Sequence, residues 1–327
     1  MTNENENDHD TENNEELQGI HISGGIIGTG EDTRAGFVAL IGAPNAGKST
    51  LLNQLVGIKV SIVTHKVQTT RALIRGVAME DKSQIIFVDT PGIFKPKRRL
   101  DRAMVDSAWG GAKDADLIAV LIDAKKGIDE EVEKILVELQ NIKLPKVLIL
   151  NKVDITKREK LLDLAAKANE YTRFDKTFMV SALNGSGTKD ILRYFGEHVP
   201  EGPWLYPEDQ ASDVPLRMLA AEITREKLYL RLHQELPYIS TVETDRWEEK
   251  KDGSVRIEQT IFVERDSQKS IVLGNKGQTI KAISQRAREE MEEAFETRIH
   301  LFVFVKVREN WSDDPERYRN MGLDFPR

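Results

Sequence analysis

The 327-residue chain contains no cysteine. This absence excludes disulfide bonds, thiolate zinc sites and cysteine nucleophiles, and it fits a reducing compartment such as the cytosol. No apolar run approaches the about 18 residues needed to span a bilayer, and the N-terminus has neither the basic region nor the apolar region of a signal peptide. We therefore expect a soluble, cytoplasmic protein.

Basic residues are missing from positions 1–33, which hold nine acidic residues. Because this stretch is also poor in aromatic residues, it cannot bury enough apolar surface to offset its ordering entropy, and we expect a disordered acidic arm. The arm dominates the net charge of −7, since residues 34–327 carry +2, divided into +7 over 34–200 and −5 over 201–327. The whole-chain charge therefore does not exclude a nucleic-acid partner.

Residues 42–49 read Gly-Ala-Pro-Asn-Ala-Gly-Lys-Ser, between an apolar run (Gly36–Ile41) and a helix start (Thr50–Leu55). A strand before and a helix after this spacing indicate a P-loop, whose backbone N–H groups and helix N-terminus bind phosphate. Lys48 is expected to reach the β- and γ-phosphates and Ser49 to bind Mg²⁺. The predicted phosphate-binding residues are Gly42, Asn45, Ala46, Gly47, Lys48, Ser49 and Thr50.

Short apolar runs alternate with helical patterns from Gly36 to about Pro200. This alternation is typical of an α/β domain, a mostly parallel, doubly wound sheet that takes its ligand groups from loops at the carboxyl ends of the strands. We assign this nucleotide-binding domain, called the G domain below, to residues 34–200. The later runs are Ile85–Val88, Leu117–Ile122, Val147–Leu150 and Phe178–Val180, and the helical stretches include Asp129–Leu139 and Lys157–Tyr171.

The sequence Asp-Thr-Pro-Gly at 89–92 follows the predicted strand 84–88. Asp89 is expected to hold Mg²⁺ through water, and the Gly92 amide to reach the γ-phosphate without a Cβ in the way. The next residue is Ile93, where small signalling GTPases carry a water-orienting glutamine. Because isoleucine cannot hydrogen-bond water, we expect slow intrinsic hydrolysis that depends on another group, a bound cation or a partner.

Two segments are predicted to respond to the γ-phosphate. Switch I, residues 60–71, has no helical or strand period, and one of its threonines is expected to complete the Mg²⁺ shell. Thr70 is the favoured ligand and Thr69 its rival, so the predicted metal ligands are Ser49, Thr70 and Asp89 and the predicted catalytic residues are Lys48, Thr70 and Gly92. Switch II, residues 92–109, carries five basic residues that suit either a solvated loop or contact with phosphate or RNA: Lys95, Lys97, Arg98, Arg99 and Arg102.

The sequence Asn-Lys-Val-Asp at 151–154 follows the predicted strand 146–150. The Asp154 carboxylate can accept hydrogen bonds from N1–H and the 2-amino group of guanine, whereas adenine would leave a buried carboxylate unpaired. The predicted guanine-binding residues are Asn151, Lys152, Asp154, Ser181 and Ala182, the last two following the strand 177–180. Competition by GTP but not ATP would distinguish this hypothesis from an ATP-dependent metabolic enzyme.

A linker is expected at 201–213, which contains prolines and lacks any period, and a second domain at 214–327. The second domain shows helix, strand, strand, short helix, long helix and strand, the order of a type II KH domain. Between its last two helices, 274–277 form a Gly-x-x-Gly loop, and residues 269–288 hold five basic residues and no acid. Such a loop lets single-stranded RNA approach the backbone closely. The predicted RNA-binding residues are Gly274, Asn275, Lys276, Gly277 and Lys281.

These motifs together resemble the Era family of bacterial GTPases, which join one G domain to a C-terminal KH domain. The resemblance covers about residues 34–320 and omits the acidic arm. It implies a monomer that binds the 3′ end of small-subunit ribosomal RNA and assists small-subunit assembly. It also implies that Asn45 holds a potassium ion, which would suit the missing glutamine at Ile93.

The resemblance leaves one alternative of another class. Era-like proteins are also found at the inner face of the membrane, so the chain could instead be a nucleotide-gated membrane-associated or cell-cycle adaptor whose RNA affinity is incidental. A basic amphipathic helix would favour this alternative. The best candidate, residues 277–296, carries its basic residues beside the Gly-x-x-Gly loop instead.

Overall fold

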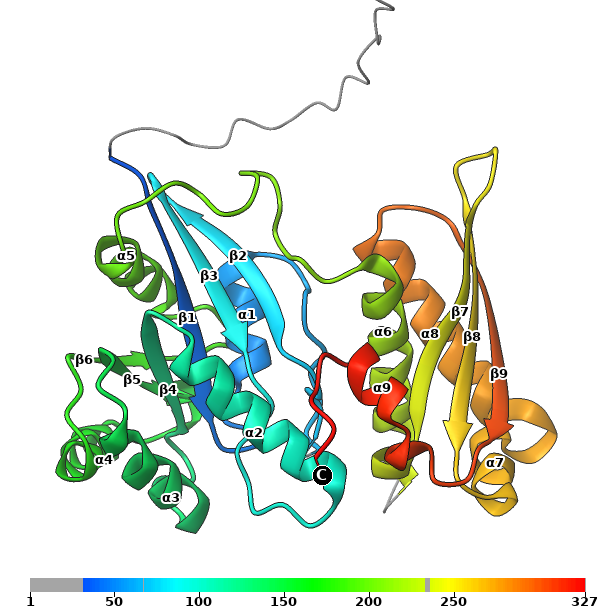
Figure 1. Ribbon diagram of the computed structural model, residues 1–327, viewed down its shortest axis with the longest axis horizontal. Helices are drawn as coiled ribbons and strands as arrows, with labels where there is room; N and C mark the ends of the chain where they lie inside the picture. The colour runs from blue at the N-terminus through cyan, green and yellow to red at the C-terminus, as the bar shows by residue number, and fades with distance from the viewer. Residues whose placement is uncertain (1–31, 67, 233–235, 327) are drawn as a thin grey trace, which may run out of the picture.

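The computed structural model describes residues 32–66, 68–232 and 236–326. The chain folds into two units, each built around its own sheet (Figure 1). Residues 1–31 of the predicted acidic arm lie outside the described part. Of the helices in the described ranges, none combines the length and apolar character needed to cross a membrane.

The first unit contains a six-stranded sheet in the order β2-β3-β1-β4-β5-β6. Neighbouring strands are parallel except at one edge, where β2 pairs antiparallel with β3. The mostly parallel sheet predicted from the sequence is confirmed. Its strands are β1 (Arg34–Gly42), β2 (Ile74–Glu80), β3 (Ser83–Asp89), β4 (Leu117–Asp123), β5 (Lys146–Asn151) and β6 (Lys176–Val180).

Helices cover both faces of this sheet. Val38 and Leu40 of β1 pack with α1 and α5, whereas the alternate residues Ala39 and Ile41 pack with α2, α3 and α4. Burial on both faces explains why the central strands are nearly continuous apolar runs. The helices are α1 (Lys48–Val56), α2 (Arg99–Lys113), α3 (Glu130–Glu138), α4 (Arg158–Tyr171) and α5 (Thr188–His198), with 3₁₀ turns η1 (Leu139–Asn141) and η2 (Val153–Ile155).

Two elements near the predicted switches were absent from the sequence interpretation. Strand β2 mixes the strand formers Ile74 and Val77 with glycine, alanine and glutamate, which are depleted in strands, so its pattern alone did not predict the pairing with β3. Helix α2 lies inside the predicted switch II. Of the basic residues there, Arg99 and Arg102 are on this helix rather than in a solvated loop.

The predicted linker contains no helix or long strand, but it is bound to the sheet edge. The N–H of Val77 in β2 donates to the carbonyl of Ala211 at 2.8 Å, and the side chain of Gln84 donates to the carbonyl of Tyr206 at 2.8 Å. These bonds satisfy groups on and beside the edge strand β2. The linker therefore leads the chain along the first unit before the second begins.

The second unit is an α+β domain whose three-stranded sheet has the order β7-β8-β9. Residues of α6 and α8 pack against this sheet. The element order agrees with the predicted type II KH domain, apart from the C-terminal turn and helix. The elements are α6 (Leu216–Arg231), η3 (Leu236–Ile239), β7 (Thr241–Glu249), β8 (Val255–Val263), α7 (Asp266–Leu273), η4 (Asn275–Gly277), α8 (Gln278–Ala294), β9 (Ile299–Val307), η5 (Trp311–Asp313) and α9 (Pro315–Asn320).

The C-terminal segment, red in Figure 1, returns from β9 to the first unit. Trp311, Tyr318 and Leu323 form an apolar cluster with Leu100 and Met104 of α2. Trp311 is almost fully buried, and its indole N–H donates to the carbonyl of Ile239 at 2.8 Å. The KH domain therefore contacts the helix of the predicted switch II.

Candidate nucleotide site and nucleic-acid interface

The P-loop joins the end of β1 to the start of α1. Asn45 and Gly47 have φ values of 63° and 100°, and a Cβ on Gly47 would lie 2.2 Å from Nδ2 of Asn151. Only glycine fits at position 47, because the backbone there has a positive φ and approaches Asn151 closely. The loop, switch I and Gly92 enclose a cavity of about 60 Å³ that includes Lys48, Ser49 and Thr70 in its lining.

Lys48 is buried at the base of this loop. Its Nζ donates to the carbonyl oxygens of Gly42 and Ala43, at 3.0 and 3.2 Å. Burial lowers the pKa of Lys48 to about 8, against an opposing effect of the Asp89 carboxylate. Anionic phosphates near this ammonium group would favour its charged form.

Ser49, Thr70 and Asp89 form a hydroxyl–carboxylate cluster. Oγ of Ser49 donates to Oδ2 of Asp89 at 2.6 Å and lies 2.9 Å from Oγ1 of Thr70. Oδ1 of Asp89 is buried without a hydrogen-bond partner, and burial raises the pKa of this carboxyl group, with Lys48 partly opposing. Hydroxyl and carboxylate oxygens around an unsatisfied acceptor fit Mg²⁺, which keeps most of its shell for water and phosphate.

Thr69 points elsewhere. Its Oγ1 lies 2.6 Å from Oγ1 of Thr64 and donates to the carbonyl of Lys66 at 2.7 Å. Between the two threonines that the sequence left as rivals, the structure brings Thr70 to the cluster.

Gly92 lies against the P-loop, where a Cβ would be 2.9 Å from Cα of Pro44. A side chain at this position would push the P-loop and switch II apart. Ile93 is buried in the apolar layer with Ala43 and Ile41. Position 93 therefore serves the core, which agrees with the expectation that it cannot orient a water molecule.

Asn151, at the end of β5, connects three loops. Its Nδ2 donates to the carbonyl of Ala46 at 2.9 Å, and its Oδ1 accepts the N–H of Ala182 at 2.9 Å. The Ala182 N–H, expected from the sequence to serve the base pocket, thus binds Asn151 in this structure. Lys152 has φ 66°, and its Nζ donates to the carbonyl of Asn45 at 2.8 Å.

A cavity of about 540 Å³ opens beside these loops, lined by Asp154 and Ser181 among others. Oγ of Ser181 is buried without a partner, so a polar group is available there for a ligand. Asp154 is exposed, whereas the sequence argument assumed a buried carboxylate. The discrimination against adenine therefore requires that the bound base itself covers this carboxylate.

The Gly-x-x-Gly loop lies between α7 and α8 in the second unit. Gly274 and Gly277 have φ values of 73° and 77°, and a Cβ on Gly274 would lie 2.1 Å from Oγ1 of Thr279. Asn275, Lys276 and Lys281 are exposed at the N-terminal end of the 17-residue helix α8. The geometry combines exposed cations, an accessible backbone and a helix N-terminus, which suits a phosphodiester chain.

Comparison with known proteins identifies both units. A family model described as "50S ribosome-binding GTPase" matches residues 37–152, and a KH domain model matches residues 235–312. GTPase Era of Brucella suis is 70% identical over 294 residues, which are 90% of this chain and 94% of the relative. The chain belongs to the Era family of GTPases.

Other Era proteins agree in sequence and fold. GTPase Era of Sinorhizobium medicae is 68% identical over 90% of this chain and 95% of its own length. Two solved Era structures are each 36% identical to this chain, and each match covers 89% of this chain and 99% of the solved chain. One is an Aquifex aeolicus Era variant bound to GDP and AlF₄⁻, with a TM-score of 0.83. The other is Era with MgGDPNP and nucleotides 1506–1542 of 16S ribosomal RNA, with a TM-score of 0.84.

One residue in contact with the predicted guanine-binding residues was missed by the sequence analysis. Asp123 ends β4, and its Oδ2 accepts a hydrogen bond from Nζ of Lys152 at 2.7 Å, while its Oδ1 accepts the N–H of Lys125 at 3.0 Å. Nζ of Lys152 is thus held between Asp123 and the P-loop carbonyl of Asn45. An acidic residue directly after the predicted strand 117–122 was the available signal.

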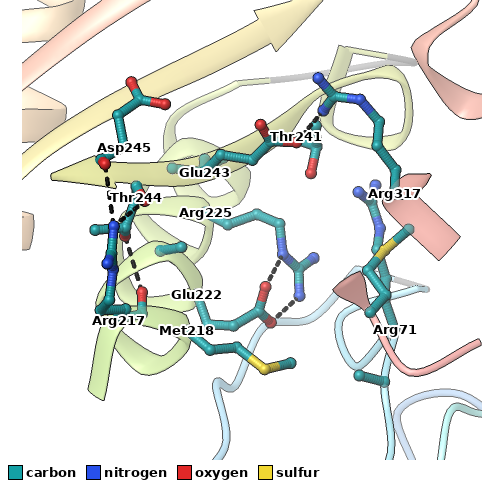
Figure 2. A pocket seen from close by; sticks show the side chains of 14 residues that line it. Arg71, Arg217, Met218, Glu222, Arg225, Thr241, Glu243, Thr244, Asp245 and Arg317 are labelled. Carbon is teal, nitrogen blue, oxygen red and sulfur yellow. Dashed lines mark hydrogen bonds and ion pairs between the residues drawn. The ribbon is translucent and has the colours of Figure 1, made fainter. Parts of the chain in front are cut away.

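The contacts between switch I and the KH domain were also missed. Arg71 is buried, and it donates to the hydroxyl of Tyr229 at 2.8 Å and to the carbonyl of Ser240 at 3.0 Å. Together with Arg225, Arg217 and Arg317, it lines a cavity of about 280 Å³ between the two domains (Figure 2). Nothing in the local sequence pattern marks Arg71 as an interdomain residue.

Proposed function

We propose that this Era-family GTPase is a molecular switch that binds small-subunit ribosomal RNA near its 3′ end and assists small-subunit assembly. The observation that carries the proposal is the solved Era complex with nucleotides 1506–1542 of 16S RNA, whose fold extends over both domains of this chain. The exposed cations and backbone geometry of loop 274–277 support the same role.

The proposed organisation has four parts. The acidic arm is 1–33, the G domain 34–200, the linker 201–213 and the RNA-binding KH domain 214–327. The start of β1 at Arg34 and of α6 at Leu216 supports these boundaries. The protein acts as a monomer in the cytoplasm. No described helix can span a membrane, and the crosslinking experiment below includes a result that would favour peripheral membrane association.

In the proposed mechanism, Lys48, the P-loop amides and the Gly92 amide hold the β- and γ-phosphates while water attacks in line. Ser49, Thr70 and Asp89 would hold Mg²⁺, which supplies charge neutralisation on the phosphates. Asn151, Lys152, Asp154, Ser181 and Ala182 orient the guanine base. Hydrolysis removes the contacts of the γ-phosphate, which releases both switches and changes how the KH domain is held.

A potassium ion near Asn45 would compensate for the absence of a water-orienting glutamine at position 93. Nδ2 of Asn45 donates to the carbonyl of His65 at 2.9 Å, which leaves Oδ1 as the oxygen for a cation. A monovalent cation beside the phosphates stabilises charge that develops in the transition state.

The decisive experiment is RNA crosslinking and sequencing in cells that express the parent or the variant Asn275→Asp/Lys276→Asp. We expect crosslinks at the 3′ end of small-subunit ribosomal RNA that disappear in the variant, while its GTP hydrolysis is unchanged. Lys251→Asp, at the exposed β7–β8 turn, is the control that makes the same lysine-to-aspartate charge reversal away from the loop and should retain the crosslinks.

One result would contradict the proposed RNA client, and another the role of the loop. Diffuse crosslinks that are equal in parent and variant would reject the RNA client and favour the membrane-associated or cell-cycle adaptor. Crosslinks at the expected RNA site that persist in the variant would keep the client but remove loop 274–277 from the interface. Separately, parental GTP affinity in Lys48→Ala would refute the assignment of the phosphate site.

A further inference from the structure

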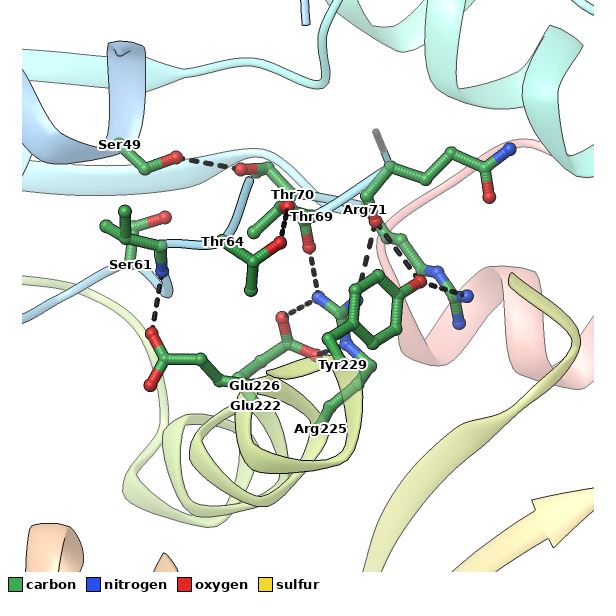
Figure 3. Close-up of polar contacts among 12 residues, drawn as sticks. Ser49, Ser61, Thr64, Thr69, Thr70, Arg71, Glu222, Arg225, Glu226 and Tyr229 are labelled. Carbon is green, nitrogen blue, oxygen red and sulfur yellow. Dashed lines mark hydrogen bonds and ion pairs between the residues drawn. The ribbon is translucent and has the colours of Figure 1, made fainter. Parts of the chain in front are cut away.

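The peptide unit before Thr70 is held by a side chain from the KH domain. Nη2 of Arg225, on α6, donates to the carbonyl oxygen of Thr69, and its Nη1 lies 3.5 Å from the carbonyl oxygen of Gln68 (Figure 3). The Thr69 carbonyl and the Thr70 N–H belong to one planar unit. A donor that fixes this carbonyl therefore fixes the plane from which Thr70 reaches the hydroxyl–carboxylate cluster.

Arg225 is itself rigidly placed. The residue is only 1% exposed, its Nε donates to Oε1 of Glu222 at 2.7 Å, and its guanidinium carbon lies 5.1 Å from the centre of the Tyr229 ring. Burial alone would lower the pKa of Arg225, but the Glu222 carboxylate raises it above its ordinary value, so the guanidinium group stays charged. A charged, planar donor that is ordered in advance loses little entropy when it binds a carbonyl.

Contacts within switch I hold the Thr69 side chain, whereas the donor to the Thr69 carbonyl comes from α6. The described residues of switch I, 60–66 and 68–71, contain neither helix nor strand, and Gln68 has a left-handed φ of 58°. Ordering each such residue costs about 1–2 kcal/mol, which contacts from outside the segment must offset. The Tyr229 hydroxyl, 3.4 Å from the Gln68 carbonyl, adds a second contact from α6.

We propose that Arg225 is a positioning residue for Thr70, so that the docked KH domain orients one magnesium ligand of the GTPase centre. The inference rests on the proposed role of Thr70. It means that withdrawing α6 from switch I weakens magnesium-dependent hydrolysis without altering any residue that binds phosphate or guanine. This contact therefore couples the KH domain to the peptide unit between Thr69 and Thr70.

The test is a magnesium titration of GTP hydrolysis. Arg225→Met removes the donors and keeps the aliphatic stem, and we expect the Mg²⁺ concentration for half-maximal rate to rise about tenfold, the usual effect of losing a charged hydrogen bond. Excess Mg²⁺ should restore the rate, whereas GDP affinity should stay within about twofold of the parent. Arg225→Lys, which cannot bridge Glu222 and Thr69 with a fork, should be intermediate.

Arg217→Met is the matched control, because Arg217 lies on the same helix but donates to the carbonyls of Thr244 and Asp245. Its magnesium titration should be parental. A folded Arg225→Met protein with a parental titration would overturn the inference, as would a loss of rate that excess Mg²⁺ does not restore. If Arg225→Met does not fold, Glu222→Gln removes the carboxylate charge that holds the Arg225 guanidinium group, and it must shift the titration in the same direction.

Thr70→Ala separates this inference from the proposed function. A parental magnesium titration in Thr70→Ala would refute Thr70 as a ligand, and the role of Arg225 with it. A shifted titration in Thr70→Ala together with an unshifted one in Arg225→Met would refute the role of Arg225 alone.

Discussion

Lys59 and Glu226 form an ion pair across the boundary between the G domain and the KH domain, with Nζ of Lys59 2.8 Å from Oε2 of Glu226. Glu226 is 3% exposed, and its Oε1 also accepts the N–H of Val63 in switch I at 2.8 Å. Nζ of Lys227 lies 2.6 Å from Oε2, and Glu290 also forms ion pairs with both lysines. One buried carboxylate on α6 thus holds both the start of switch I and the segment before it.

This carboxylate makes stability depend on pH. Burial alone would raise the pKa of Glu226, but Lys59, Lys227 and the Val63 N–H bring it below its ordinary value of 4.5. A group whose pKa is lower in the folded protein stabilises it above pH 4.5, and the contribution is lost as pH falls through the folded value. Glu226→Gln should lower the free energy of unfolding by about 3 kcal/mol at neutral pH and by much less near pH 3.

Denaturant titrations of the parent and Glu226→Gln at both pH values measure this difference. Glu248→Gln, an exposed carboxylate of β7, is the control and should change stability little at either pH. A Glu226→Gln penalty of equal size at both pH values would contradict the assignment of the stabilising charge to this residue.

Asp154 should determine the choice of base. In Asp154→Asn, the side-chain oxygen can still accept N1–H, but the amide donor now meets the 2-amino donor of guanine and instead pairs with the 2-oxo group of xanthine. GTP affinity should fall about 10²-fold or more, and XTP affinity should rise. Competition with a labelled nucleotide measures both, and Asp163→Asn on the exposed face of α4 is the control. Unchanged GTP affinity would remove Asp154 from the base site.

The proposed potassium site at Asn45 predicts that the rate of GTP hydrolysis depends on the monovalent cation. GTP hydrolysis should be at least about tenfold faster in K⁺ than in Na⁺ at the same ionic strength, since the cation stabilises charge on the phosphates in a site where Ile93 cannot orient the water. Asn45→Ala should lose this difference while it keeps Mg²⁺-dependent binding of GTP. Equal rates of the parent in the two salts would refute the potassium site.

Trp311 should carry much of the stability of the contact between the C-terminal segment and α2. Trp311→Ala empties a buried site against Leu100 and Met104, and should lower the free energy of unfolding by about 3–5 kcal/mol. Trp311→Phe keeps a smaller aromatic ring but leaves the Ile239 carbonyl without its donor, so the loss should be about 1–3 kcal/mol. Chemical denaturation measures both, and equal losses would assign the effect to the hydrogen bond rather than to packing.

The sequence could predict the parts of the nucleotide site that depend on local geometry. Gly47 and Gly92 mark close backbone approaches. The parallel strands that end at Asp89 and Asn151 place these polar groups at the same end of the sheet, where the strands have their carboxyl ends. The parallel sheet, the KH element order and the Gly-x-x-Gly loop follow from apolar periodicity and turn residues in the same way. The sequence favoured Thr70 but left Thr69 as a rival, because both lie in a segment without any period.

The sequence by itself determined the family, both folds and the chemistry of the ligand, because each depends on residues that are near one another in the chain. Only the tertiary structure decided how the two domains meet. Arg225 lies 156 residues from Thr69, and Trp311 lies far in sequence from α2, so no local pattern pairs them. Contacts of this kind arise when separate amphipathic surfaces are buried together, and they determine which residues hold the switches.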